Sequence, residues 1–198
     1  MERKPHDSIR PMRLVLASAS PRRAELLRSA GFDFEVVPAD VDETPRAGEA
    51  APDYTLRVAR DKARHVARQE RAGGVVLAAD TEVTIDGEIL GKPRDPAHAS
   101  RMLATLSGRE HQVLTAVVLC RGSREVWEVV TTAVRFVPMS ADEIEWYVAS
   151  GEPMGKAGAY AIQGRCARFI DRIEGSWANV VGLPVDAVYR LVTGLGSR

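Results

Sequence analysis

Two charged side chains lie beside a short apolar run, in positions from which they could act on a phosphate group. The apolar residues Val75–Ala79 predict a buried strand, and Asp80 follows where that strand would leave the core. Lys92 comes later, in a short break between Gly91 and Pro93. A carboxylate and an ammonium group on adjoining segments suit a metal-bound polyphosphate, and a structural salt bridge between them is the alternative.

A second group of candidates lies at the first junction between a strand and a helix. Residues 13–17 (RLVLA) predict a short strand, and residues 18–23 (SASPRR) lead into a helix for which Ser20 is a favourable N-cap. Arg22 and Arg23 fall in the first turn of that helix, whose amino end attracts anions. The junction therefore predicts a phosphate cradle, and two solvated arginines are the alternative.

Further candidates come from the loop and the helix that follow. Asp42 and Glu43 form an acidic pair in a polar loop, where they either bind a hard cation or are simply solvated. A helix is predicted from Asp53 to about Arg71, and Lys62 adjoins its apolar face. Such a lysine either reaches into a site or lays its stem along the surface.

The segment 155–164 (GKAGAYAIQG) combines glycines with two side chains that could bind a ligand, Lys156 and Gln163. Glycine allows the backbone to approach a ligand closely. The segment therefore predicts a substrate-binding loop that carries both residues.

Strands and helices alternate along the chain to position these residues. Apolar runs and alternation predict strands at 13–17, 32–37, 75–79, 111–119, 125–137 and 167–173. Capping and terminating residues predict helices that begin near 20, 53, 96, 140 and 184. Asp86-Gly87 favours a tight hairpin turn, and Ser140 with Glu143 makes a capping box. The pattern predicts a mixed α/β protein with one domain at 13–198.

Composition restricts the classes of partner. The 198 residues include 27 Lys and Arg and 27 Asp and Glu, so no overall positive charge draws the protein to nucleic acid. No apolar run approaches the length that spans a membrane, and residues 1–12 are interpreted as a flexible, charged extension rather than a signal. Cys120 and Cys166 lack metal-type spacing and have apolar neighbours, which favours reduced core thiols and a cytoplasmic location.

Six segments, taken in order, resemble motifs of the Maf family of nucleoside triphosphate pyrophosphatases, and the resemblance covers about residues 14–191. They are LASASPRR (16–23), AADTEV (78–83), LGKP (90–93), LSGREHQVLTAV (106–117), KAGAYAIQG (156–164) and NVVGLP (179–184). The resemblance implies an inosine-triphosphate-pyrophosphatase-like (Maf/Ham1) fold, in which a twisted mixed sheet flanked by helices forms two lobes around a nucleotide cleft. It also implies cleavage of a nucleoside triphosphate between the α- and β-phosphates with Mg²⁺ or Mn²⁺, and a homodimer.

The resemblance also implies a role for each matching residue. Asp80 matches the essential carboxylate, which is usually assigned as the proton acceptor for the attacking water, and it is a potential metal ligand. Glu43 matches an acidic loop residue tied to the metal. The other matches are expected to contact the phosphates, and they are Lys62, Lys92, Ser18, Arg22 and Arg23.

The expected substrate depends on Gln163. Its amide offers a donor and an acceptor that can pair with the edge of uracil or thymine, and the family's Gln-bearing branch is associated with dTTP and UTP. Arg22 and Thr81 match the two other positions of that branch. A branch with Glu at this place is associated with 7-methyl-GTP. Alternatively, Gln163 only braces its loop.

The chain departs from the family pattern at two places. Gly155 replaces the usual Asp, which could loosen the loop around Lys156, and Glu82 stands where an apolar residue is common. Glu82 either adds an acidic group near the site or faces solvent. The sequence thus predicts a dTTP/UTP pyrophosphatase that cleans the nucleotide pool. The alternatives are a 7-methyl-GTP pyrophosphatase and a non-catalytic, nucleotide-sensing regulator of septum formation.

Overall fold

One mixed sheet runs through the computed structural model, which describes residues 13–69 and 73–196. Its strands are β1 (Leu14–Leu16), β2 (Phe34–Val36), β3 (Val75–Ile85), β4 (Glu88–Ile89), β5 (Glu110–Arg121), β6 (Arg124–Phe136) and β7 (Ile170–Glu174). Their order is β2-β1-β3-β5-β6-β7, with β4 paired to β3. β1 runs parallel to β2 and β3, and the other pairs are antiparallel. The predicted mixed sheet is confirmed.

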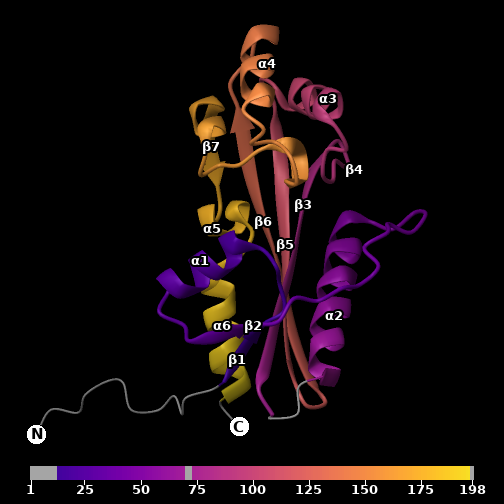
Figure 1. Ribbon diagram of the computed structural model, residues 1–198, viewed down its shortest axis with the longest axis vertical. Helices are drawn as coiled ribbons and strands as arrows, with labels where there is room; N and C mark the ends of the chain where they lie inside the picture. Colours follow the sequence, from indigo (N-terminus) through magenta and orange to yellow (C-terminus); the bar gives the residue numbers. More distant parts are fainter. Residues whose placement is uncertain (1–12, 70–72, 197–198) are drawn as a thin grey trace, which may run out of the picture.

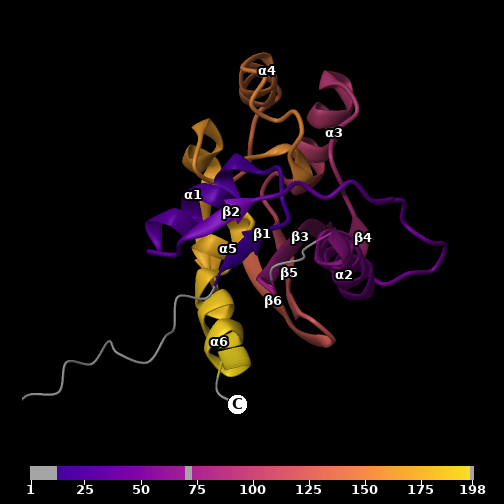
Figure 2. The ribbon, with the colours of Figure 1, turned by 60° about the horizontal axis from the view of Figure 1, so that its bottom comes forward.

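Helices cover both faces and one end of this sheet (Figure 1). They are α1 (Pro21–Ser29), α2 (Ala51–Gln69), α3 (Pro96–Leu106), α4 (Ala141–Ala149), α5 (Trp177–Val181) and α6 (Val185–Gly196), with the 3₁₀ helices η1 (Ala157–Ala159) and η2 (Arg165–Phe169). Figures 1 and 2 show α2 on one side of the long strands and α1 and α6 on the other. Apolar side chains fill the space beneath each of these helices. A third cluster packs α3 and α4 onto the far end of the strands.

β3 is a long strand that pairs with β1 near its start and with β4 near its end. The part of this edge that lies between β1 and β4 has no neighbouring strand. Before this unpaired part, where β1 ends, the Ala17 N–H donates to the Leu77 carbonyl over 2.7 Å. After the unpaired part, the Leu90 N–H, just beyond the end of β4, donates to the Val83 carbonyl over 2.9 Å. The edge between these two bonds, at residues 79–82, faces a gap between β1 and β4.

Several local predictions are confirmed. The Ser140 hydroxyl accepts the Glu143 N–H over 3.2 Å, and the Glu143 carboxylate accepts the Ser140 N–H over 2.7 Å, which completes the capping box. Asp86 and Gly87 turn β3 into β4 with φ values of 53° and 84°. Both angles lie in the left-handed region that two-residue hairpin loops require.

Other local predictions are wrong in part. The expected strand at 167–173 begins only at Ile170, because the 3₁₀ helix η2 occupies the residues before it. Between the strand predicted at 167–173 and the helix predicted near 184, the structure contains a further short helix, α5, that was not predicted. Ser20 is the N-cap residue of α1, but its side chain makes no capping hydrogen bond.

Some predictions concern residues outside the described ranges, namely the extension at 1–12 and the end of the second helix at Arg71. Within those ranges, no helix has the length and apolar character needed to cross a membrane. Cys120 and Cys166 are both buried and free, as predicted.

The buried pair His111 and Tyr160 leads to a prediction about stability. The His111 Nε2 lies 2.8 Å from the Tyr160 hydroxyl, and burial lowers the pKa of His111 from 6.5 to about 4. The unfolded chain therefore binds more protons between these pH values, so the free energy of unfolding should fall as the pH drops through this window. The loss should reach about 3 kcal/mol and level off below the folded pKa.

Urea unfolding of the wild type and of His111→Gln between pH 4 and pH 8 checks this prediction. The variant should be less stable at pH 8 but should lose less stability on acidification. His65→Gln, at a partly exposed position on α2, is the control for replacing a histidine. Equal slopes for the wild type and His111→Gln would contradict the prediction.

Candidate active site

The gap beside β3 opens into a cavity of about 360 Å³. All the site residues predicted from the sequence except Asp42 line it, although they come from distant segments. They are Ser18, Arg22, Arg23, Glu43, Lys62, Asp80, Thr81, Lys92, Lys156 and Gln163. Asp42, the other member of the predicted acidic pair, is exposed and accepts the Thr44 N–H over 2.9 Å. The structure therefore separates the pair and keeps only Glu43 at the cavity.

Asp80 forms an ion pair with a lysine on α2. Lys62 Nζ lies 2.7 Å from Asp80 Oδ1 and 2.7 Å from Glu43 Oε1, so one ammonium group joins two carboxylates. Lys92 Nζ is 3.8 Å from Glu43 Oε2. Asp80 pairs with Lys62 rather than with Lys92, and Lys62 reaches into the site instead of lying along the surface.

The position of Asp80 corrects the sequence prediction. The residue lies in the middle of β3 and is 5% exposed, whereas it was expected at the end of a strand. A buried carboxylate is tolerated there because Lys62 supplies an opposite charge at hydrogen-bond distance. The other oxygen of Asp80, Oδ2, has no hydrogen-bond partner in the described part of the chain.

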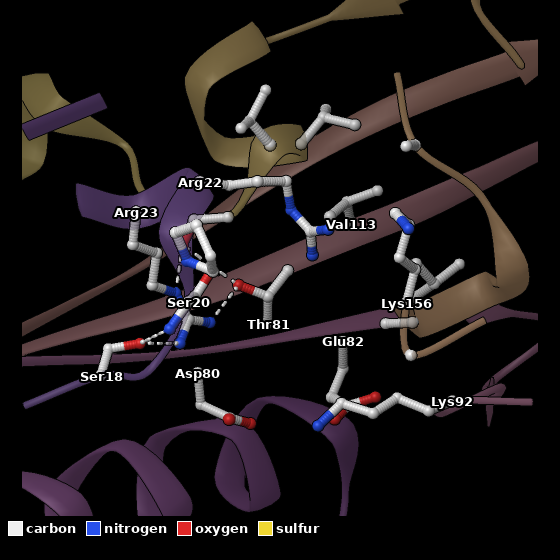
Figure 3. Close-up of a pocket in the computed structure, with 18 of the residues that line it drawn as sticks. Ser18, Ser20, Arg22, Arg23, Asp80, Thr81, Glu82, Lys92, Val113 and Lys156 are labelled. Carbon is white, nitrogen blue, oxygen red and sulfur yellow. Dashed lines mark hydrogen bonds between the residues drawn. The ribbon is translucent and has the colours of Figure 1, made fainter. Parts of the chain in front are cut away.

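On the opposite side of β3, Arg23 connects three segments. Its Nε donates to the Gly182 carbonyl over 2.8 Å, and its terminal nitrogens donate to the Ser18 and Thr81 hydroxyls over 3.2 and 3.0 Å. The pKa of Arg23 lies below its ordinary value, because burial lowers it by more than the nearby Asp80 carboxylate raises it. Figure 3 shows Arg22 extending over the cavity from the same helix. The two arginines therefore differ, because the guanidinium of Arg23 is engaged in hydrogen bonds within the protein.

Glu82 lines the cavity, so it adds an acidic group to the site rather than facing solvent. It is 8% exposed, and burial together with the charge of Asp80 raises its pKa to about 8. Its Oε2 has no hydrogen-bond partner in the described ranges. Burial also raises the pKa of Glu43, but the hydrogen bond and the charge of Lys62 outweigh this effect and hold that pKa below its ordinary value.

Gln163 lies at the rim of the cavity and is exposed. No hydrogen bond joins its amide to another described residue, so the loop is braced by other groups. The Glu152 carboxylate accepts the Tyr147 hydroxyl over 2.9 Å and the Arg165 N–H over 3.0 Å. A Cβ at Gly164 would lie 2.3 Å from Glu152 Oε1, so a larger residue there would displace the carboxylate that braces the loop.

Lys156 is held by backbone carbonyls instead of a neighbouring acid. Its Nζ donates to the Glu152 carbonyl over 2.5 Å, with the Met154 carbonyl at 3.5 Å. Burial and the charge of Arg22 lower the pKa of Lys156. Gly155 adopts a φ of 71° in the same turn, which few other residues tolerate. The loop therefore positions Lys156 without a carboxylate at 155.

Several supporting residues were not identified from the sequence. The Tyr54 hydroxyl donates to the Glu43 carbonyl over 2.8 Å and positions that loop. The buried Asn179 amide donates to the Val113 carbonyl and the Thr132 hydroxyl, each over 2.9 Å, and fixes the helix that ends at Gly182. The spacing of Ser176 and Asn179, whose N–H the Ser176 hydroxyl accepts, was the available signal for a helix start here.

The fold is similar to that of the Ham1 protein of Staphylococcus aureus, with a TM-score of 0.52 over 92% of this chain and 97% of that chain at 15% sequence identity. The likeness shows a shared fold and agrees with the predicted Maf/Ham1 architecture.

Sequence relatives match over nearly the full length. A dTTP/UTP pyrophosphatase from Anaeromyxobacter sp. (strain Fw109-5) is 55% identical over 93% of this chain and 90% of its own length. Proteins of the same name from Methylococcus capsulatus and Myxococcus xanthus are 50% and 52% identical, covering 93% and 92% of this chain and 92% of each relative. Residues 13–195 match the family described as Maf-like protein. The chain belongs to the Maf family.

Proposed function

We propose that this protein hydrolyses dTTP and UTP to the nucleoside monophosphate and pyrophosphate. The observation that carries the proposal is the distribution of charge in the cavity, where carboxylates and lysines line one side of β3 and arginine and hydroxyl groups the other. A triphosphate needs positive groups along its length and a carboxylate at the bond that breaks. The relatives named dTTP/UTP pyrophosphatase support the choice of substrate.

In the proposed reaction, a water molecule attacks the α-phosphorus and the bond to the oxygen bridging the α- and β-phosphates breaks. The water's hydroxyl stays on the monophosphate, and its proton passes to the carboxylate of Asp80. Lys92 and Arg22 offset the charge that develops on the pyrophosphate. Lys62 holds the carboxylate of Asp80 in place for the transfer.

The residues of the cavity also fit a divalent cation. Asp80 Oδ2 is buried without a partner, and carboxylate oxygens are the ligands that Mg²⁺ and Mn²⁺ prefer. Asp80 and Glu43 would hold the ion beside the phosphates. When bound, such an ion lowers the pKa of the attacking water and neutralises phosphate oxygens.

Gln163 is the residue proposed to read the base. Its exposed amide can donate to a carbonyl and accept from the N3–H of uracil or thymine, and the apolar side chains of Val113, Ile162 and Val181 line the same cavity. Thr81 and Arg22 complete the set expected in the dTTP/UTP branch. The homodimer and the cytoplasmic location stay predictions from the sequence.

A nucleotide panel tests the proposal and makes a prediction about Gln163. The wild type and Gln163→Glu are mixed with dTTP, UTP, CTP, GTP or 7-methyl-GTP and Mg²⁺ or Mn²⁺, while pyrophosphate and orthophosphate are followed separately. The wild type should release pyrophosphate from dTTP and UTP. Gln163→Glu should lose about 10- to 100-fold in kcat/KM for both, because the amide donor is lost and the carboxylate repels a carbonyl oxygen.

Other results would overturn separate parts of the proposal. Selective turnover of 7-methyl-GTP by the wild type would keep the reaction and refute the role of Gln163. Release of orthophosphate alone would contradict cleavage between the α- and β-phosphates. Nucleotide binding without turnover would favour the regulator. Gln69→Glu, on the exposed end of α2, makes the same chemical change away from the cavity and should leave kcat/KM unchanged.

A further inference from the structure

Glu82 is a buried acid at the cavity for which the proposed reaction has no role. Its carboxylate is on β3, 8% exposed, and makes no ion pair with any of the described residues. Its Oε2 lacks a hydrogen-bond partner in that part of the chain, as does Oδ2 of Asp80. The cavity therefore contains two buried carboxylate oxygens that the protein alone does not satisfy.

These two oxygens belong to the same side of the strand. Side chains alternate along a β-strand, so Asp80 and Glu82 project from one face and Thr81 from the other. Figure 3 shows the carboxylates of Asp80 and Glu82 on the lower side of β3. Thr81, by contrast, extends towards Arg23.

The acidic groups at this side of the cavity outnumber the ammonium groups, which favours the binding of a cation. Lys62 is within 2.7 Å of Asp80 and of Glu43, so its charge is already shared between two acids. Lys92 lies 3.8 Å from Glu43. Three acidic side chains thus face two ammonium groups. A buried carboxylate is costly unless it is paired or bound to a metal, and Glu82 has neither kind of partner in the protein.

As they stand, no three His, Cys, Asp or Glu side chains of the described residues are grouped closely enough to hold a metal ion. A Mg²⁺ or Mn²⁺ ion that accompanies a nucleotide needs only one or two protein carboxylates, because phosphate oxygens and water fill the other positions. We infer that Glu82, together with Asp80, binds this divalent cation. The inference rests on the proposed function and adds to it a further ligand for the cation.

Mn²⁺ binding tests this inference without measuring turnover. The Mn²⁺ affinity of each protein is measured by electron paramagnetic resonance, with and without a UTP analogue that has methylene in place of the α,β-bridging oxygen. Glu82→Gln should bind Mn²⁺ about tenfold or more weakly than the wild type, because the amide keeps the shape but not the anionic oxygen. Glu88→Gln removes an exposed carboxylate on β4 and should match the wild type.

Two further measurements separate the inference from other roles for Glu82. Glu82→Asp keeps a carboxylate and should retain Mn²⁺ affinity between those of the wild type and Glu82→Gln. In EDTA, Glu82→Gln should bind the analogue as tightly as the wild type or more tightly, since an acidic side chain facing the triphosphate has been removed. Weaker binding in EDTA would instead make Glu82 a nucleotide contact and overturn the inference.

The remaining outcomes distinguish this inference from the proposed function. If the wild type and Glu82→Gln bind Mn²⁺ equally, Glu82 is not a ligand, while the proposed reaction stands. If the wild type binds no Mn²⁺ even with the analogue, both the inference and the proposed cation fail. Thermal unfolding of each variant verifies that the folded protein is the species measured.

Discussion

Asp80→Asn is expected to lower kcat for dTTP and UTP by about 10³-fold, the order of effect that a positioned proton acceptor contributes. Asparagine keeps the shape of the side chain, and its Oδ1 can still accept from Lys62, which lies 2.7 Å from that oxygen in the wild type. The amide cannot take a proton from water. Pyrophosphate release under saturating substrate measures the effect.

Binding controls determine how that loss is interpreted. Because Lys62 also pairs with Glu43 over 2.7 Å, the lysine keeps one carboxylate partner in the variant and the fold should persist. The methylene analogue of UTP should therefore still bind to Asp80→Asn. A variant that retains kcat within a few-fold of the wild type would refute the assignment of Asp80.

Arg23→Lys is expected to reduce kcat/KM by about 100-fold and to destabilise the fold by about 2–4 kcal/mol. A planar guanidinium donates in three directions at once, to the Gly182 carbonyl and to the Ser18 and Thr81 hydroxyls. An ammonium group on a flexible stem cannot make all three bonds. Urea unfolding and pyrophosphate release measure the two effects.

Arg22→Lys is the matched control, since Arg22 occupies the adjacent position on the same helix and extends over the cavity (Figure 3). It keeps the charge and should raise KM for the nucleotide, with a change in stability of only about 0.5 kcal/mol or less. Equal losses of stability in the two variants would show that the contacts of Arg23 do not connect the segments as described.

Much of the site could be predicted because its residues occur in short, ordered motifs. Such motifs name residues but not distances. The sequence offered Lys92 as the partner of Asp80, whereas the fold brings Lys62 of α2 to that carboxylate. Likewise, nothing local to Gln163 points to Glu152 as the brace of its loop. Contacts between segments far apart in the chain depend on packing, which periodicity does not reveal.

The errors in secondary structure have particular physical causes. β3 was expected to stop at Asp80 because a buried charge normally ends a strand, but an ion pair from another element removes that obstacle. In η2, the buried residues Cys166 and Phe169 are three apart, the period of a 3₁₀ helix, and this spacing is too short a signal to distinguish from a strand. α5 has only five residues, too few for apolar periodicity to predict it.

The unpaired edge of β3 also affects how the protein avoids association with other chains. An exposed strand edge offers backbone groups on which a foreign strand can add, and this is a common route to aggregation. The bonds at Leu77 and Val83 show that odd-numbered residues direct their backbone groups to this edge, so Ala79 and Thr81 do so in the gap. The open stretch is closed off at both ends by β1 and β4, and it is shorter than a typical strand of five or six residues. An opening that is wide enough for a small molecule is thus too short for another polypeptide to extend the sheet.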